Sequence, residues 1–246
     1  MEIHAHSSPA PGGAHTPGKK WTHYLWEFLM LFLAVFCGFI AENIREHYVE
    51  KERGKQYIRS FYEDLVTDSS QLNRLISRYQ LKVSVLQNMS PCYDSLLSKS
   101  PPKNCLTTII QNTLTFPDLI YTDRTLQQLK NAGGLRLLNR ADADSILLYD
   151  NLLREYKANE TSGLQESQSD IRNTFYSLVN YESWKDSLTT SRIFALYGNN
   201  KELLNRYFNQ LKIHLLWCKA RLTDLQQLKK RNAGLIDFFK NKYHLE

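Results

Sequence analysis

The sequence predicts an all-α protein, in which one N-terminal transmembrane helix continues into an antiparallel helical bundle with long first and last helices. An apolar run near the N-terminus predicts the membrane helix, and two later heptad patterns predict the long bundle helices. Glycine and proline are scarce: the 246 residues include ten glycines and seven prolines, of which four and three precede Gly54. Little turn-forming sequence therefore remains for a many-stranded sheet. We expect a tail over residues 1–20, a membrane span over residues 21–41 and a bundle over residues 42–246.

The tail is rich in proline, glycine, serine and histidine. Such a composition buries too little apolar surface to fold, so we expect residues 1–20 to be disordered. The tail's histidines are His4, His6 and His15, and they lack the fixed geometry that a metal site requires. We therefore expect no metal site here and no cofactor elsewhere in the chain.

The segment from Trp21 to Ala41 is the predicted membrane span. Its length would be about 31 Å as a helix, close to the ~30 Å hydrocarbon core of a bilayer. The centre of the span, from Phe28 to Ala41, holds no charged residue. The charge within the span is Glu27, which lies shallow enough to reach the headgroups or a partner. Aromatic side chains typical of a membrane interface stand at the start of the span: Trp21, Tyr24 and Trp26.

Two other interpretations of this segment are weaker. A cleaved signal peptide would end in small residues, whereas Phe39 and Ile40 precede Ala41. A buried core helix would carry an apolar stripe rather than an apolar surface all round. The small residues Ala34, Gly38 and Ala41 would let a second helix approach closely and form a dimer, although ordinary residue usage explains them equally well.

The side of the membrane that the bundle faces stays open. Lys19 and Lys20 precede the span, and five basic residues follow it within about twenty positions: Arg45, Lys51, Arg53, Lys55 and Arg59. The positive-inside rule then favours a cytoplasmic bundle. A short tail with adjacent lysines instead matches a signal anchor that exports the chain behind it.

A pattern of three- and four-residue steps follows the span and predicts a long helix with a coiled-coil-like face. Its positions are Ile58, Phe61, Leu65, Asp68, Leu72, Leu75, Tyr79, Lys82 and Leu86, of which the Asp and the Lys are polar exceptions. The helix should end between Asn88 and Pro91, where a loop to Asn104 begins. Cys92 and Cys105 flank this loop and would form a disulfide in an oxidising compartment; two free thiols are the other interpretation.

Shorter helices are expected in the middle of the chain. One runs from Cys105 to Thr115, and Thr122 or Asp123 would cap the next, which stops at a glycine pair. Asn139 is a candidate N-cap for a helix over residues 140–159, with an aspartate at its third position. A break or bend at residues 161–163 precedes another amphipathic run, and Asn200 would cap the last helix.

The last helix carries the clearest heptad pattern, with nine apolar positions out of eleven. The apolar positions are Leu204, Phe208, Leu211, Leu215, Cys218, Leu222, Leu225, Ile236 and Phe239, and the polar ones are Lys229 and Asn232. We expect this helix to pack along the first bundle helix. We interpret His214 as a packed or surface histidine rather than a ligand, and Trp217 as a core residue rather than a binding platform.

Basic residues are concentrated in this last helix. From Lys201 onward, ten Lys and Arg against four Asp and Glu account for the whole net charge of +6. The densest group is Lys229, Lys230 and Arg231. Contact with an anionic lipid surface is one interpretation, and a solvated helix face is the favoured one. No nucleic-acid-binding module accompanies the group, so no nucleic-acid partner is expected.

The stretch from Lys20 to His47 resembles the N-terminal anchor of an uncharacterised Bacteroidota family of single-pass membrane proteins with a domain of unknown function. It reads KWTHYLWEFLMLFLAVFCGFIAENIREH. An aromatic-acidic run like that from Tyr57 to Asp68 follows the anchor in that family. A second stretch, from Leu126 to Asn139, is similar to a segment of the same family and reads LQQLKNAGGLRLLN. The resemblance implies a bacterial inner-membrane location and supplies no catalytic residues.

The sequence holds no visible activated nucleophile, acid–base pair, metal-ligand set or phosphate-binding loop, so we do not expect an enzyme. A long bundle on a membrane helix favours a scaffold, an assembly partner or a signal-relay subunit. The alternative is a membrane-anchored bundle that senses a small ligand between its helices. The expected partners are the lipid bilayer and either a second copy of the chain or another membrane protein.

Overall fold

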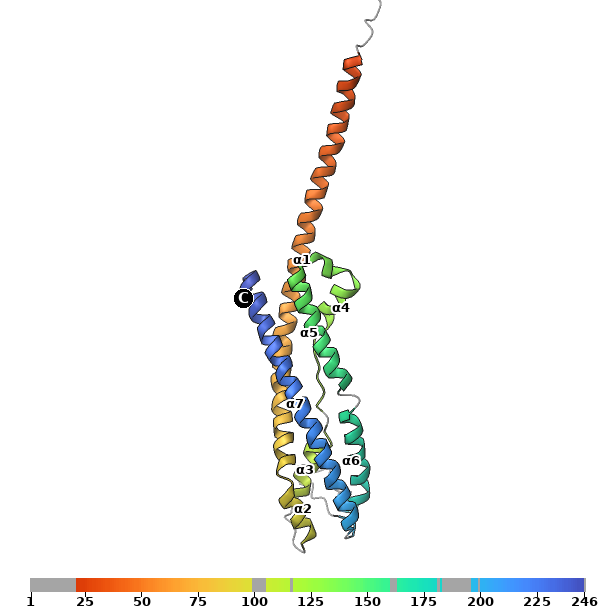
Figure 1. Cartoon of the computed structure of the whole chain (residues 1–246), viewed down its shortest axis with the longest axis vertical. Coiled ribbons are helices and arrows are strands. Elements are labelled where there is room, and N and C mark those ends of the chain that lie inside the picture. Colours follow the sequence, from red (N-terminus) through yellow and green to blue (C-terminus); the bar gives the residue numbers. More distant parts are fainter. Residues whose placement is uncertain are drawn as a thin grey trace, which may run out of the picture. The chain divides into compact units, whose positions relative to one another are not determined.

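The structure is a computed structural model, and it describes residues 21–98, 105–115, 117–159, 163–180, 182, 196–198 and 200–245 (Figure 1). The predicted tail over residues 1–20, with its three histidines, lies outside this part of the chain. The chain divides into two compact units, the first ending at Glu50 and the second beginning at Lys51.

Helices make up almost all of the described part of the chain. They are α1 (Trp21–Gln87), α2 (Ser90–Leu97), α3 (Cys105–Thr113), α4 (Arg124–Asn131), the short 3-10 helix η1 (Gly134–Leu137), α5 (Arg140–Asn159), α6 (Gln165–Leu178) and α7 (Lys201–Tyr243). A single β-bridge joins Val179 and Leu196 within the described segments. The prediction of an all-α fold with long first and last helices is confirmed.

Within the second unit, α1 and α7 lie side by side and run antiparallel (Figure 1). Phe61 of α1 packs edge-on against Phe239 of α7, with ring centroids 6.0 Å apart. Further along α1, the Leu65 carbonyl accepts a hydrogen bond of 3.0 Å from the side chain of Asn232, which is earlier in α7. All nine positions predicted on the α1 seam are buried, the two polar ones included.

The buried face of α7 is wider than the predicted heptad seam. A further row at seven-residue spacing is buried, although the seam left it out: Tyr207, His214, Arg221, Leu228 and Leu235. Lys229, a predicted seam position, is exposed instead. The prediction that the buried face of α7 is a strict heptad seam is therefore wrong. α7 packs against α5 and α6 as well as α1, so it buries a broader stripe than a coiled coil does.

Two asparagines cap helices as the sequence predicts. Asn139 accepts a hydrogen bond of 3.0 Å from the backbone N–H of Asp142, and its amide donates back to the Asp142 carboxylate. Asn200 accepts a hydrogen bond of 3.0 Å from the backbone N–H of Leu203 at the start of α7. Each bond satisfies one of the N–H groups that a helix leaves unpaired at its beginning.

The loop predicted between the two central cysteines contains a helix instead. α2 begins directly after α1, and Pro91 occupies its first turn, where a missing N–H costs nothing. The predicted break at residues 161–163 lies between α5 and α6, which are separate helices, although residues 161 and 162 themselves are outside the described residues.

Asp64 of α1 provides the cap that the sequence assigns to Thr122 or Asp123. Its carboxylate accepts hydrogen bonds from the Thr125 backbone N–H at 3.3 Å and from the Arg124 side chain at 2.9 Å. Asp123 stands at the N-cap position of α4 without a side-chain capping bond. The predicted local cap is therefore wrong, because a buried carboxylate of another helix occupies the positive end of the α4 dipole.

Asp68, one turn after Asp64 on α1, fixes the segment that leads into α4. It accepts a hydrogen bond of 2.8 Å from the backbone N–H of Thr122. Burial raises the pKa of the Asp68 carboxyl to about 6, although this hydrogen bond acts in the opposite direction. Asp68, the first polar exception in the α1 seam, thus holds the irregular segment before α4 against α1.

Buried donors satisfy the carbonyl groups at the end of α3. Lys82 of α1 donates a hydrogen bond of 2.9 Å to the Thr115 carbonyl. Gln168 of α6 donates to the carbonyls of Leu114 at 3.1 Å and Thr113 at 3.3 Å. A helix ends with unpaired carbonyls and a negative dipole end, so a lysine and an amide suit this place.

Gly54 lies where α1 meets η1. A Cβ atom at this position would stand 2.6 Å from the Leu137 carbonyl oxygen, which is closer than such atoms approach. On the other side of the contact, a Cβ atom on Gly134 would stand 3.2 Å from the Tyr57 ring. The absence of a side chain at Gly54 therefore lets η1, and the start of α5 behind it, lie directly against α1.

We expect Asp64→Ala to lower the free energy of unfolding by about 1–3 kcal/mol, because it leaves the Thr125 N–H and the Arg124 guanidinium without their buried acceptor. Urea unfolding of the purified chain, followed by circular dichroism, measures the loss. Glu63→Ala removes an exposed carboxylate one residue earlier and should change stability by less than about 0.5 kcal/mol. Equal losses in the two variants would contradict the cap.

Candidate functional site

A cavity of about 600 Å³ lies between α6 and α7 in the second unit. Carboxylates line it from both helices: Glu166 and Asp170 from α6, and Glu202 from α7. Arg206 is the basic residue among the lining side chains, and the others include the amides of α7. The volume falls within the range of about 300–1,000 Å³ that is typical of small-molecule sites.

Trp217 borders this cavity and is not a core residue. It is 37% exposed, and a Cβ atom on Gly163 would stand 2.5 Å from its ring. The residue that lies against the indole is thus a glycine, which has no side chain. The expectation that Trp217 is a core residue is wrong, because its side chain is partly exposed at the cavity.

The cavity favours a ligand that is positively charged and donates hydrogen bonds. Its three carboxylates outnumber the single guanidinium by two charges. Gln210, which also lines the cavity, has a buried amide oxygen with no hydrogen-bond partner among the described residues. The indole of Trp217 adds an aromatic face, which attracts organic cations.

A buried polar cluster lies behind the cavity. The Ser167 hydroxyl, which lines the cavity, is hydrogen bonded to Nδ1 of His214 at 2.7 Å. His214 is fully buried, and burial, together with the positive charge of Lys82, lowers its pKa to about 3. Such an imidazole stays neutral at pH 7 and removes protons poorly. The pair therefore does not provide an activated serine nucleophile.

Cys218 belongs to the same buried cluster. Burial raises the pKa of its thiol to about 11, against the weaker opposite effect of Lys82. A thiol in this environment is inert, because the thiolate is the reactive form. Cys218 is thus a core residue, as the sequence indicated.

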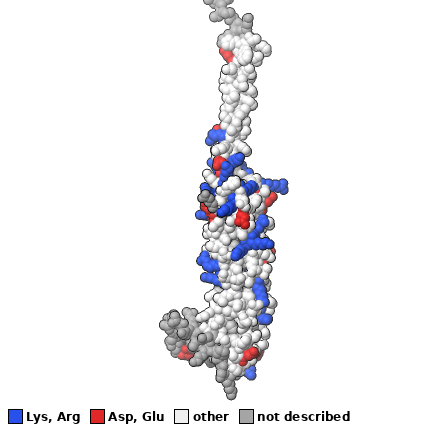
Figure 2. All heavy atoms as spheres, turned by 90° about the vertical axis from the view of Figure 1, so that its left-hand side faces the viewer, with Lys and Arg blue, Asp and Glu red and all other residues white. Residues whose placement is uncertain are grey.

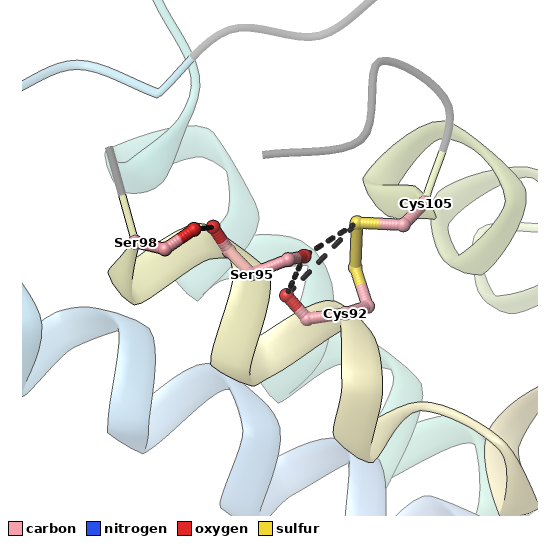
Figure 3. The surroundings of a disulfide bond; sticks show 4 residues. All are labelled: Cys92, Ser95, Ser98 and Cys105. Atoms are coloured by element: carbon pink, nitrogen blue, oxygen red, sulfur yellow. Dashed lines mark hydrogen bonds between the residues drawn. A yellow bond between two sulfur atoms is a disulfide. The ribbon is translucent and has the colours of Figure 1, made fainter. Parts of the chain in front are cut away.

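Cys92 of α2 and Cys105 at the start of α3 are joined by a disulfide (Figure 3). Their Cα atoms lie 5.5 Å apart, within the ordinary range for this bond. The Ser95 hydroxyl donates a hydrogen bond of 2.8 Å to the Cys92 carbonyl and lies 3.8 Å from the Cys105 sulfur. The structure therefore brings together the two cysteines that the sequence offered as a pair, while Cys37 and Cys218 are free.

The predicted span lies in the first unit, where every residue from Trp21 to Tyr48 is exposed. Sixteen of these residues are large and hydrophobic. Figure 2 shows their side chains as a long white stretch. α1 is the one helix in the described part of the chain that is long and apolar enough, by length and composition, to cross a membrane.

The structure also shows the surroundings of Glu27 and of the small residues in the predicted span. Glu27 lies beside His23, with Nδ1 and the carboxylate 3.4 Å apart. No atom lies within 4 Å of a Cβ built on Gly38, so the small-residue face of Ala34, Gly38 and Ala41 has room for a neighbour. This arrangement permits close helix packing and does not require it.

The group Lys229, Lys230 and Arg231 lies partway along α7. It precedes Asn232, whose side chain bonds to the α1 backbone at Leu65. The two lysines are exposed and the arginine is half-buried. They are thus spread around α7 on the side of the bundle and do not form a flat basic surface.

Within the described residues, no group of three or more His, Cys, Asp or Glu side chains is placed to hold a metal ion. No protein family, curated protein or solved structure matches the chain. The functional inference therefore depends on the arrangement of this chain's own residues.

The cavity is the feature that the sequence analysis missed. Its signals are weak: Glu166 and Asp170 are four residues apart on one helix, and Glu202 and Arg206 are four apart on another. Such spacing is ordinary for an exposed helix face. Only the pairing of α6 with α7 turns these two faces into one cavity, and periodicity within a helix does not reveal which helices pair.

The pKa of His214 predicts a pH dependence of stability. The folded value is about 3 and an unfolded histidine titrates near 6.5, so between these values only the unfolded chain binds the proton. Stability should therefore fall as the pH drops through this window, by up to about 1.4 kcal/mol per pH unit from this residue. His214→Gln should show a correspondingly shallower slope in urea unfolding between pH 4 and 6.5.

Ser167→Ala is the matched control for this measurement. It removes the hydrogen bond but keeps the imidazole, so it should cost about 1 kcal/mol and retain the wild-type slope. If His214→Gln and wild type had parallel slopes, the buried neutral histidine would be disproved.

Proposed function

We propose that this chain is a single-pass protein of the bacterial inner membrane, and that its bundle is a non-catalytic scaffold, assembly partner or signal-relay subunit. The observation that carries the proposal is the exposed apolar run of α1 from Trp21 to Tyr48. Sixteen large hydrophobic side chains on an uncovered helix need an apolar environment. The likeness of this run to the Bacteroidota anchor supports the inner membrane as the location.

The same helix supports a non-catalytic role. α1 continues past Lys51 and supplies the seam from Ile58 to Leu86, on which the second unit is built. The two polar positions of that seam, Asp68 and Lys82, hold backbone segments through hydrogen bonds, and the buried Asp64 beside the seam does the same. These groups are therefore committed to structure.

We further propose that the bundle faces the oxidising side of the membrane. The disulfide between Cys92 and Cys105 supports this, because such bonds persist outside the reducing cytoplasm. A short-tailed signal anchor would give the same orientation. Closing a segment of 13 residues by a disulfide stabilises a fold by roughly 3 kcal/mol, so the compartment affects the bundle directly.

An alkaline-phosphatase fusion at the C-terminus should be active, and a matching fluorescent-protein fusion should be dark. Both should stay in the membrane pellet after an alkaline wash. Leu31→Arg combined with Val35→Arg should release the chain from the pellet, because each arginine at the centre of a span costs about 2.5–3.5 kcal/mol. The control is Val66→Arg with Leu81→Arg, which changes exposed apolar residues of α1 in the second unit and should leave the chain in the membrane.

Each part of the proposal has its own contradicting result. A dark phosphatase with a bright fluorescent fusion would reverse the orientation. Wild type in the soluble fraction would remove the membrane anchor. Chemical cross-linking in membranes that returned monomer alone would contradict the scaffold and assembly role.

A second candidate function is the sensing of a small organic cation, and the cavity between α6 and α7 favours it. The chemistry of its lining matches a linear amine: carboxylates for the charge, amide oxygens for the N–H groups and the indole of Trp217 for the chain. The cavity is also next to α7, which packs on α1. A ligand in the cavity would therefore contact α7, which packs on the helix that carries the anchor.

Spermidine, used as a probe, should raise the thermal midpoint of the full chain in detergent, since a ligand at 100 times its Kd stabilises by about 2.7 kcal/mol. Glu166→Gln combined with Asp170→Asn should abolish the shift. Glu63→Gln combined with Asp144→Asn removes two exposed carboxylates outside the cavity and should retain it. A shift of equal size in both variants would indicate general charge attraction and exclude the cavity.

A further inference from the structure

Eight basic residues meet at the end of the second unit that begins with Lys51. They come from α1, from η1 with the start of α5, and from the end of α7. We call them the basic end: Lys51, Arg53, Lys55, Arg59, Arg136, Arg140, Lys240 and Lys242. All eight are exposed.

Close contacts hold the contributing segments together. The approach at Gly54 places η1 against α1. The ring contact between Phe61 and Phe239 places the end of α7 beside the same part of α1. Lys242 of α7 then reaches the buried carboxylate of Asp142 in α5 at 2.6 Å. Three segments that are far apart in the sequence therefore contribute to the basic end.

The charge of this surface is unbalanced. Its segments, residues 51–60, 134–144 and 237–245, hold eight basic residues and four acidic ones, a net charge of +4. One of the four, Asp142, is fully buried and pairs with Lys242, so these two charges offset each other and leave seven basic residues against three acidic ones. Figure 2 shows Lys and Arg gathered over this part of the second unit.

Among the described residues, the opposite end of the same unit shows no such excess. Its segments, residues 84–98, 170–180, 196–198 and 200–206, hold three basic and three acidic residues. The disulfide lies at that end, where Tyr93 packs on Phe208 with ring centroids 5.0 Å apart. The end where the chain connects to the apolar run thus carries a net charge of +4, whereas the described segments of the opposite end are neutral.

We propose that the basic end contacts the anionic phospholipid headgroups of the bilayer that holds the apolar run, an inference that rests on the proposed membrane anchoring. Ten residues lead from Ala41 to Lys51, about 15 Å of helix, so the chain keeps this surface within reach of the headgroups. Each Lys or Arg near an anionic membrane surface adds a factor of about five to the attraction. The sequence offered lipid contact as the less favoured interpretation of other basic residues, Lys229, Lys230 and Arg231, which lie on the side of the bundle.

The test uses the full chain in lipid nanodiscs of phosphatidylcholine, with or without about one third of phosphatidylglycerol. A donor dye on Ala141→Cys, an exposed site beside Arg140, reports energy transfer to an acceptor on headgroup-labelled lipid. The background carries Cys37→Ala, and the buried Cys218 and the bonded cysteines do not take up the dye. We expect greater transfer with phosphatidylglycerol, and a loss of that difference as salt rises from 50 to 500 mM, because salt screens the attraction.

The decisive variant combines Arg53→Gln, Arg140→Gln and Lys240→Gln. Three fewer basic residues should lower the ratio of docked to undocked chain about 100-fold. The matched control combines Lys219→Gln, Lys229→Gln and Lys230→Gln, which removes three exposed lysines from the side of α7 and should leave the transfer as in wild type. Circular dichroism checks that both variants keep the wild-type helix content.

Several results would overturn the proposal. If energy transfer in the wild type were the same with and without phosphatidylglycerol, the basic end would have no role. The same would follow if energy transfer fell equally in the two variants. Loss of transfer on adding inorganic phosphate at constant ionic strength would assign the surface to free phosphate. A chain that does not enter the nanodiscs would disprove the anchoring as well, whereas a chain that enters them without lipid dependence would disprove this proposal alone.

Discussion

The rest of the bundle packs on one face of α1. The seam of α1 from Ile58 to Leu86 is buried along its whole length, and α7 packs along it in the opposite direction. The polar members of that face organise the irregular part of the chain. Asp64 binds the start of α4, Asp68 binds Thr122 just before it, and Lys82 binds Thr115 just after α3. Hydrogen bonds as well as apolar contacts therefore fix these three places to α1.

The sequence predicted what depends on periodicity within a helix and on local capping. It found both long helices, all nine positions of the α1 seam and the caps at Asn139 and Asn200. It failed where partners come from distant parts of the chain. The cap of α4 comes from Asp64, which lies sixty residues before Arg124 in the chain, and no local pattern indicates it. The width of the buried face of α7 depends on α5 and α6, which a single heptad pattern does not contain.

The candidate sites follow the same division. Each cysteine of the disulfide was visible as a residue flanking a turn, so the pair could be proposed from spacing. The cavity between α6 and α7 and the basic end are both assembled from separate helices. Their residues are ordinary exposed charges in the sequence and become sites only through packing. The cavity and the basic end are therefore products of tertiary structure, whereas the apolar run of α1 is a product of local composition.

The close approach at Gly54 sets a limit on how this protein can vary. A Cβ atom at this position would stand 2.6 Å from the Leu137 carbonyl oxygen, so there is no room for a side chain. Any other amino acid would force η1 to shift away from α1. The arginines on η1 and α5 would then move away from those on α1. A buried position without any side chain thus decides whether the basic residues of three segments lie together on one surface.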